Sequence, residues 1–251
     1  MALVLYSQSA GVATLTLNRD DKRNAVNRQM ADELLAGLSR AVEEEARVVV
    51  LRANAGARVW CAGHALSELD PESLDEDNAT LAVCRRILDL PLPVVAMVEG
   101  SVRAGGLILL LAADIVVAAE NADVSIPAGK IGLPLAPQWY ALWLRVMGLH
   151  KVKEMLLAAT TLSAAEAHAS GLYNRLVPHD ALEPTVYGLA AEIAAGVPAA
   201  VAHMKRHLNA LATTPALSEE DLAAIEQGNQ RLLNDPATRE RIAAILASLQ
   251  R

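Results

Sequence analysis

Residues 94–119 read VVAMVEGSVRAGGLILLLAADIVVAA. VVAMVEG (94–100) and IVVAA (115–119) are short apolar runs, typical of strands that are buried on both faces. SVRAGG (101–106) is a glycine-containing turn, and the apolar run that follows it is predicted to be a helix. Strand, turn, helix and strand in this order predict an α/β fold, in which helices cover a largely buried sheet.

The same alternation extends toward the N-terminus. Residues 3–6 and 12–17 are predicted strands, and the second has the alternation of a half-buried strand. Residues 28–45 carry apolar side chains at helical spacing, and 48–52 (VVVLR) is again a short buried strand. Residues 53–77 are rich in Ala, Gly, Asp and Glu, and we expect them to be irregular.

Beyond about residue 135 the pattern becomes mostly helical. Ser163 with Glu166 three residues later is a capping-box signature for the start of one helix. We therefore predict a core over residues 1–195 and a C-terminal helical region over residues 196–251. The expected helices cover residues 136–147, 150–158, 163–170, 181–195, 197–212, 218–233 and 236–249.

Composition excludes several classes of protein. The 251 residues carry a net charge of −7 and no Phe, so the core is aliphatic and no basic footprint for nucleic acid is present. The two cysteines, Cys61 and Cys84, are too few for a disulfide scaffold and favour a reducing compartment. The N-terminus has no signal-peptide pattern, and the longest apolar run, residues 107–113, is far shorter than the ~20 residues of a membrane span. We expect a soluble, cytoplasmic protein.

Two segments carry the candidate chemistry. VWCAGHALSEL (59–69) is a small-residue turn, and MVEGSVRAGG (97–106) is a strand that runs into a helix N-terminus. Helix N-termini expose unpaired N–H groups at a positive dipole end. Two such turns side by side could direct two N–H donors at one carbonyl oxygen, which is an oxyanion hole. Spacing alone equally allows two packing turns, because strand–glycine–helix connections are common.

These segments resemble the two signature turns of the crotonase (enoyl-CoA hydratase/isomerase) superfamily, F-x-A-G-x-D and V-x-G-x-x-x-G-G-G. The likeness runs through nearly the whole chain. It includes Lys22–Ala25 (P-x-x-x-N-A), Ala113–Ala118 (C-D-x-x-x-A), Ile131–Pro134 (L-G-x-x-P) and Gly148–Leu172.

The resemblance implies the crotonase fold, which is a spiral of ββα units followed by C-terminal helices that mediate trimerisation. It implies that the backbone N–H groups of His64 and Gly105 bind the oxygen of an acyl-CoA thioester. Coenzyme A is then part of the substrate, and no tightly bound cofactor is expected. A homotrimer, or a hexamer built from two trimers, is the assembly that the resemblance implies.

The chain departs from the hydratase pattern at three positions. The two hydratase glutamates fall on Ile108 and Ala128, and the Asp after the first donor is Ala65. Without carboxylates there, nothing at these positions can activate water or protonate the α-carbon. The motifs look most like the methylmalonyl-CoA decarboxylase branch, whose reaction needs enolate stabilisation but no general base. That branch carries a Tyr where this chain has Leu135, and Tyr140 follows five residues later.

We therefore favour decarboxylation of a malonyl-type CoA thioester. Another acyl-CoA reaction and a catalytically silent acyl-CoA binder remain alternatives. We expect Trp60, Trp139 and Cys61 to pack in the core, and we predict no metal site and no dinucleotide site. A role in substrate binding for Arg103, Lys22 and Arg23 competes with a simple solvent-exposed position. The candidate catalytic residues are His64, Gly105 and Tyr140, and the candidate substrate-binding residues are Lys22, Arg23, Ala62, Leu66, Arg103, Ile108, Ile126, Ala128 and Leu135.

Overall fold

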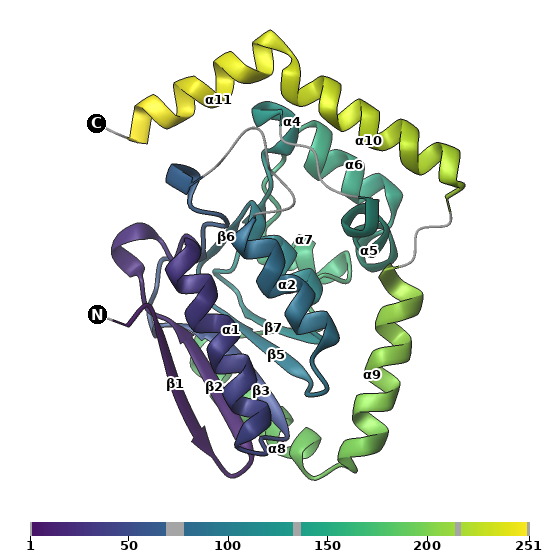
Figure 1. The fold of residues 1–251 in the computed structure, drawn as a ribbon. Coiled ribbons are helices and arrows are strands. Elements are labelled where there is room, and N and C mark those ends of the chain that lie inside the picture. The colour runs from purple at the N-terminus through teal and green to yellow at the C-terminus, as the bar shows by residue number, and fades with distance from the viewer. Residues whose placement is uncertain (1, 69–77, 133–136, 214–216, 250–251) are drawn as a thin grey trace.

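A computed structural model describes residues 2–68, 78–132, 137–213 and 217–249 (Figure 1). Its larger sheet has the strand order β1-β2-β3-β5-β7-β9. β1 pairs with β2 in antiparallel fashion, and all the other neighbours are parallel. The strands are β1 (Val4–Ser9), β2 (Val12–Leu17), β3 (Val48–Ala53), β5 (Val94–Val98), β7 (Ile115–Ala119) and β9 (Arg175–Val177).

A second sheet is built from the segments that directly follow three of these strands. It has the order β4-β6-β8, with β4 (Val59–Cys61), β6 (Ser101–Arg103) and β8 (Val124–Ser125) all parallel. Each of the pairs β3–β4, β5–β6 and β7–β8 leads into a helix. The first strands of the pairs are neighbours in the larger sheet in the order β3-β5-β7, and the second strands are neighbours in the smaller sheet in the order β4-β6-β8. This repetition is the predicted spiral of ββα units.

The sequence prediction was wrong about these short strands. Val59–Cys61 had been expected to be irregular and Ser101–Arg103 to be a turn, and neither β8 nor β9 was foreseen. Strands of two or three residues are too short to display a period of two. They exist because parallel neighbours, distant in sequence, supply their hydrogen bonds.

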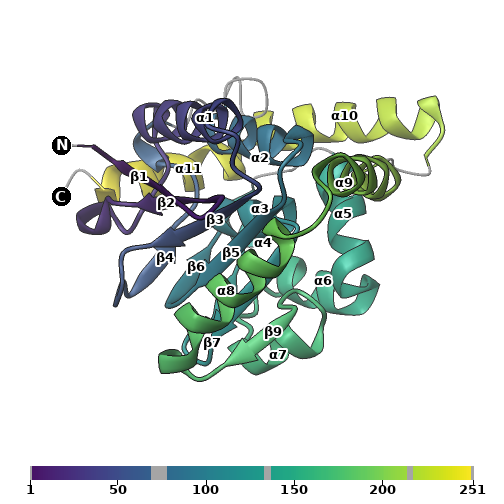
Figure 2. The same ribbon diagram turned by 90° about the horizontal axis from the view of Figure 1, so that it is seen from below.

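Helices cover both faces of the larger sheet (Figure 2). Alternate residues of β3 serve opposite faces: Val49 and Leu51 join the core beneath α1 (Arg28–Glu43) and α2 (Ala79–Asp89), whereas Val48 and Val50 face α8 (His179–Ala194). The shorter helices are η1 (Asp20–Lys22), η2 (Leu66–Glu68), α3 (Gly105–Ala112), α4 (Ala128–Ile131), α5 (Pro137–Met147), α6 (Leu149–Leu157) and α7 (Ala164–Ala169). The capping box predicted at Ser163 is confirmed at the start of α7.

The C-terminal helices are α9 (Pro198–Thr213), α10 (Glu219–Asn234) and α11 (Pro236–Leu249). α9 is fixed to the core by Lys205, whose Nζ donates to Asp114 Oδ2 at 2.7 Å and to the Leu92 carbonyl at 2.8 Å. α10 buries none of its side chains and extends along the top of the molecule, and α11 returns to contact η2 and α4 (Figure 1). The proposed division at residues 195 and 196 stays a prediction.

In the described part of the chain, no single helix is long and apolar enough to cross a membrane; α8 and α9 meet the length and composition criteria only as a pair bent by 109°.

Candidate active site

The two turns singled out in the sequence meet in space. β4 and β6 are parallel neighbours, so their carboxyl ends lie side by side, and Gly63 follows one while Gly105 follows the other. A Cβ atom placed on Gly63 would lie 2.4 Å from Gly105 N, and one placed on Gly105 would lie 3.2 Å from His64 N. Gly63 also has a φ of +86°, which a side chain rarely tolerates. Only glycine allows the two backbones to approach this closely.

The backbone N–H groups of His64 and Gly105 differ from those around them in their hydrogen bonding. Three backbone N–H groups close by do donate: Ala62 N to Arg23 O, Ala65 N to Val26 O, and Ala104 N to Ser125 O, at 2.8–3.0 Å. Among the described residues, no hydrogen bond starts from His64 N or Gly105 N. Gly105 is the first residue of α3, so its N–H has no acceptor within the helix and lies at the positive dipole end. Two adjacent N–H donors of this kind can form an oxyanion hole.

Ala104 holds the second turn in a strained conformation. This residue caps α3 with a φ of 45° and a ψ of −122°, a combination that favours glycine. Its Cβ lies 3.1 Å from where a Cβ on Gly63 would stand, so the methyl group packs between the two turns. Strain of this kind concentrates where a backbone must present its groups in a fixed direction.

The His64 side chain is half-buried beside the two donors. Burial lowers its pKa, while a hydrogen bond with the Glu68 backbone and the charge of the Glu68 carboxylate oppose this shift. The ring is therefore neutral at pH 7. Its Nδ1 atom is buried and has no partner among the described residues. Glu68 also accepts a hydrogen bond from Arg28 N at 2.7 Å, which ties η2 to the start of α1.

Asn24 anchors the first turn, although the sequence marked it only as part of a motif. Its side chain is fully buried, accepts from Arg19 N and donates to the Val59 carbonyl. Its own carbonyl accepts from the Cys61 thiol at 3.3 Å. Lys22 and Arg23 precede it on the exposed surface, and the Arg23 carbonyl holds Ala62 N. Both cationic side chains thus lie on a loop that touches the site.

A model of the family described as "Enoyl-CoA hydratase/isomerase" matches residues 7–244. The chain belongs to this family. It is 30% identical to methylmalonyl-CoA decarboxylase of Escherichia coli strain K12, over 89% of this chain and 87% of that protein. The solved structure of methylmalonyl-CoA decarboxylase in complex with 2-nitronate-propionyl-CoA superposes with a TM-score of 0.94 at 28% identity, and the match covers 98% of this chain and 96% of the other. A probable enoyl-CoA hydratase of Rhodobacter capsulatus is 34% identical, over 90% and 88% of the two chains.

The two positions where the resemblance places the hydratase glutamates are Ile108 and Ala128 in this chain. Ile108, one helical turn beyond Gly105, is 2% exposed, and Ile126 is 4% exposed, so both are buried apolar residues. Ala128 begins α4, and Leu135 lies outside the described residues. Ala62 and Leu66 are half-buried on either side of His64. The candidate acyl side of the site is therefore apolar as far as it is described.

The packing residues lie where they were expected. Trp60 is fully buried and donates its indole N–H to the Met97 carbonyl at 2.8 Å. Cys61 is also fully buried, and burial raises the pKa of its thiol to about 12, so it is no thiolate nucleophile at neutral pH.

Arg103 has polar partners within the protein itself. Arg103 forms an ion pair with Asp123 at 2.6 Å and a hydrogen bond to Ser101 Oγ, so its own partners explain it without a substrate. Tyr140 lies half-buried on α5. The roles predicted for Arg103 and Tyr140 stay predictions.

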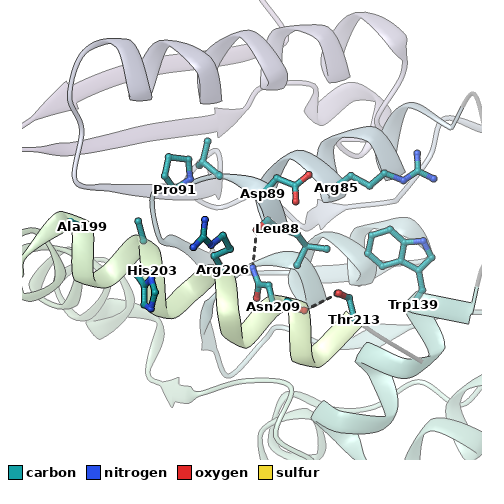
Figure 3. Close-up of a pocket in the computed structure, with 13 residues that line it drawn as sticks. Arg85, Leu88, Asp89, Pro91, Trp139, Ala199, His203, Arg206, Asn209 and Thr213 are labelled. Atoms are coloured by element: carbon teal, nitrogen blue, oxygen red, sulfur yellow. Dashed lines mark hydrogen bonds between the residues drawn. The ribbon is translucent and has the colours of Figure 1, made fainter. Parts of the chain in front are cut away.

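A surface groove of about 710 Å³ lies elsewhere, between α2, α5 and α9 (Figure 3). Arg85 and Asp89 line it from α2, Trp139 from α5, and His203 and Arg206 from α9. Neither His64 nor Gly105 belongs to its lining. The groove is thus separate from the paired donors, which remain the candidate active site on chemical grounds.

α11 covers part of the neighbourhood of the site. Thr238 and Ile242 are buried among the side chains of α11 that the structure describes, and Thr238 packs against Gly132 just after α4. Arg241 donates to the Lys130 carbonyl at 2.8 Å. α11 therefore packs on η2 and α4 of its own chain. The sequence analysis gave the C-terminal helices a role in trimerisation and did not predict this contact.

Proposed function

We propose that this protein decarboxylates a malonyl-type CoA thioester and stabilises the resulting enolate between the N–H groups of His64 and Gly105. The observation that carries the proposal is the pair of unused donors beside a wall where Ile108 stands in place of a carboxylate. Coenzyme A enters as part of the substrate.

The reaction needs only what these residues offer. The thioester oxygen accepts hydrogen bonds from the two N–H groups. The bond between the α-carbon and the carboxylate breaks, carbon dioxide leaves, and the electron pair passes into an enolate whose charge rests on the thioester oxygen. A proton from water then completes the α-carbon. One donor of such a hole accelerates acyl chemistry by roughly 10²–10³-fold.

One group of relatives supports decarboxylation. The similar E. coli protein is a methylmalonyl-CoA decarboxylase, and a solved structure of such an enzyme holds 2S-carboxypropyl-CoA. The alternative is a different acyl-CoA reaction, favoured by the 34% identity to a probable enoyl-CoA hydratase. A silent acyl-CoA binder is the third candidate, because the described wall holds few polar groups.

Mass spectrometry after incubation with malonyl-, methylmalonyl-, ethylmalonyl- and crotonyl-CoA separates these candidates. Decarboxylation predicts the loss of carbon dioxide from a malonyl-type thioester. Addition of water to crotonyl-CoA would instead identify a hydratase and contradict the proposal. Binding without any product would identify a silent binder.

We further propose that α9 joins copies of the chain into a trimer or a hexamer. Several large apolar side chains on or beside this helix are exposed to solvent by 55–72%, namely Val197, Met204, Leu208 and Leu211. A continuous apolar face of this kind is typical of a surface that another chain covers.

A further inference from the structure

Thr80 carries a hydroxyl group that the fold leaves without a partner. It is the second residue of α2, its side chain is 1% exposed, and Oγ1 has no hydrogen bond among the described residues. Asn78 caps the helix and accepts from Thr80 N and Leu81 N, so the backbone is satisfied while the hydroxyl is not. A threonine inside a helix can donate its hydroxyl to the carbonyl four residues back. For Thr80 that carbonyl belongs to Glu76, which lies outside the described residues.

The Thr80 side chain contacts the turn that carries the second donor. A Cβ placed on Gly105 would lie 3.3 Å from Thr80 Cγ2 and 3.2 Å from His64 N. Oγ1 is bonded to the same carbon as Cγ2, so the hydroxyl belongs to a side chain that packs on Gly105. Only four described side-chain atoms are buried, polar and without a partner: Thr80 Oγ1, His64 Nδ1, and the indole nitrogens of Trp139 and Trp143. The first two belong to residues that contact Gly105 through other atoms, Thr80 Cγ2 and His64 N.

We propose that Thr80 determines substrate specificity by donating a hydrogen bond to a carboxylate carried on the acyl group next to the thioester. This rests on the proposed function, which places the thioester oxygen between His64 N and Gly105 N. A purely apolar acyl group would leave the hydroxyl unpaired in a dry site, which is unfavourable. A hydroxyl orients a carboxylate without neutralising its charge, so it does not oppose the loss of carbon dioxide as an arginine would.

Equilibrium binding tests the proposal independently of turnover. The probes are 2-carboxypropyl-CoA, a thioether that lacks the thioester carbonyl, and propyl-CoA, which differs from it only by the carboxylate. In calorimetric titrations, we expect Thr80→Val to weaken 2-carboxypropyl-CoA binding by about 10-fold or more and propyl-CoA binding by less than about 2-fold. Thr80→Ser, which keeps the hydroxyl, should restore most of the discrimination.

Thermal unfolding gives a second readout. Because Val replaces an unpaired buried hydroxyl with a methyl group of similar shape, Thr80→Val should raise the Tm. Equal losses for the two probes, no loss for either, or a lower Tm would each overturn the proposal. A further outcome is that the wild-type protein releases no carbon dioxide from malonyl-type thioesters while Thr80→Val still weakens only 2-carboxypropyl-CoA binding. In that case the proposed reaction is wrong and the carboxylate site stands.

Discussion

The candidate site depends on single residues whose backbone is exposed to the substrate. Gly63 and Gly105 permit the approach of two chains, and Ala104 accepts strain at the point where α3 begins. Side chains contribute little to this arrangement, because the donors are peptide groups. A substitution that tests the site must therefore change the position of the backbone.

Gly63→Ala should abolish most of the activity. The added Cβ would meet Gly105 N at 2.4 Å and force the two turns apart. We expect kcat/KM to fall by roughly 100-fold or more, as when an oxyanion donor is lost. Gly56→Ala is the matched control, because Gly56 has a φ of +76° but nothing within 4 Å of its would-be Cβ. If the two variants lose the same activity, the contact between the turns is irrelevant to catalysis.

His64 should make stability sensitive to mild acid. Burial lowers its pKa in the folded protein, with partial opposition from Glu68. As the pH falls through the usual value of about 6.5, the unfolded chain takes up this proton first, so stability decreases in the window just below that pH. Urea unfolding from pH 8 to 5.5 should show a shallower decrease for His64→Gln than for wild type. Parallel profiles would refute a buried neutral ring.

At the scale of elements, α9 is fastened to the sheet by one buried ion pair. Asp114 also accepts from Val94 N at 2.7 Å, and Lys205 donates to the Leu92 carbonyl, so the ion pair links α9, β5 and the loop before β5. Burial raises the pKa of Asp114 and lowers that of Lys205, and the attraction between the two charges opposes both shifts. The pair is costly to break because each charge would remain buried alone.

Lys205→Ala should therefore destabilise the protein by about 3–5 kcal/mol, since it leaves an uncompensated buried carboxylate. Chemical denaturation measures this change. Lys151→Ala is the control: its partner is Glu154, both side chains are 30–45% exposed, and such surface pairs contribute about 0–1 kcal/mol. A loss as small as that of the control would mean that water reaches Asp114.

α11 should contribute to activity although no residue of it was predicted to bind substrate. Ile242 is 3% exposed where α11 packs, so Ile242→Glu should detach the helix from α4 and η2. We expect a decrease of about 10-fold or more in kcat/KM and faster proteolysis within residues 217–249. Ala243→Glu, at the neighbouring exposed position, should change neither.

The long helices and strands, and the two turns that carry the family motifs, could be predicted from the sequence. The short strands and the contacts between residues distant in sequence could not. The strand Val12–Leu17 and the helix Pro236–Leu249 lie where the periodicity placed them. The His64 and Gly105 turns are brought together as the motifs implied. Thr80 escaped notice because it reaches the site only through the packing of α2 against α3, and no local pattern reports such a contact.

At the scale of the whole molecule, the exposed apolar face of α9 predicts assembly. Size-exclusion chromatography with light scattering should give the mass of a trimer or hexamer of 26.6 kDa chains. Leu208→Lys, at a side chain that is 66% exposed, should shift the protein toward monomer without lowering its helix content. Leu157→Lys changes a side chain that is 76% exposed on α6 and should leave the assembly intact. A wild-type monomer would refute this interface.

The spiral also has a consequence for how the chain is made. The sheet face formed by Val12, Val48, Val95 and Val117 is covered by α8, whose residues 179–194 emerge from the ribosome after all the strands they cover. Until then, a broad apolar surface with parallel strand edges stays open to water. A nascent chain that pauses before residue 179 should therefore be retained by chaperones, and release should coincide with the synthesis of α8.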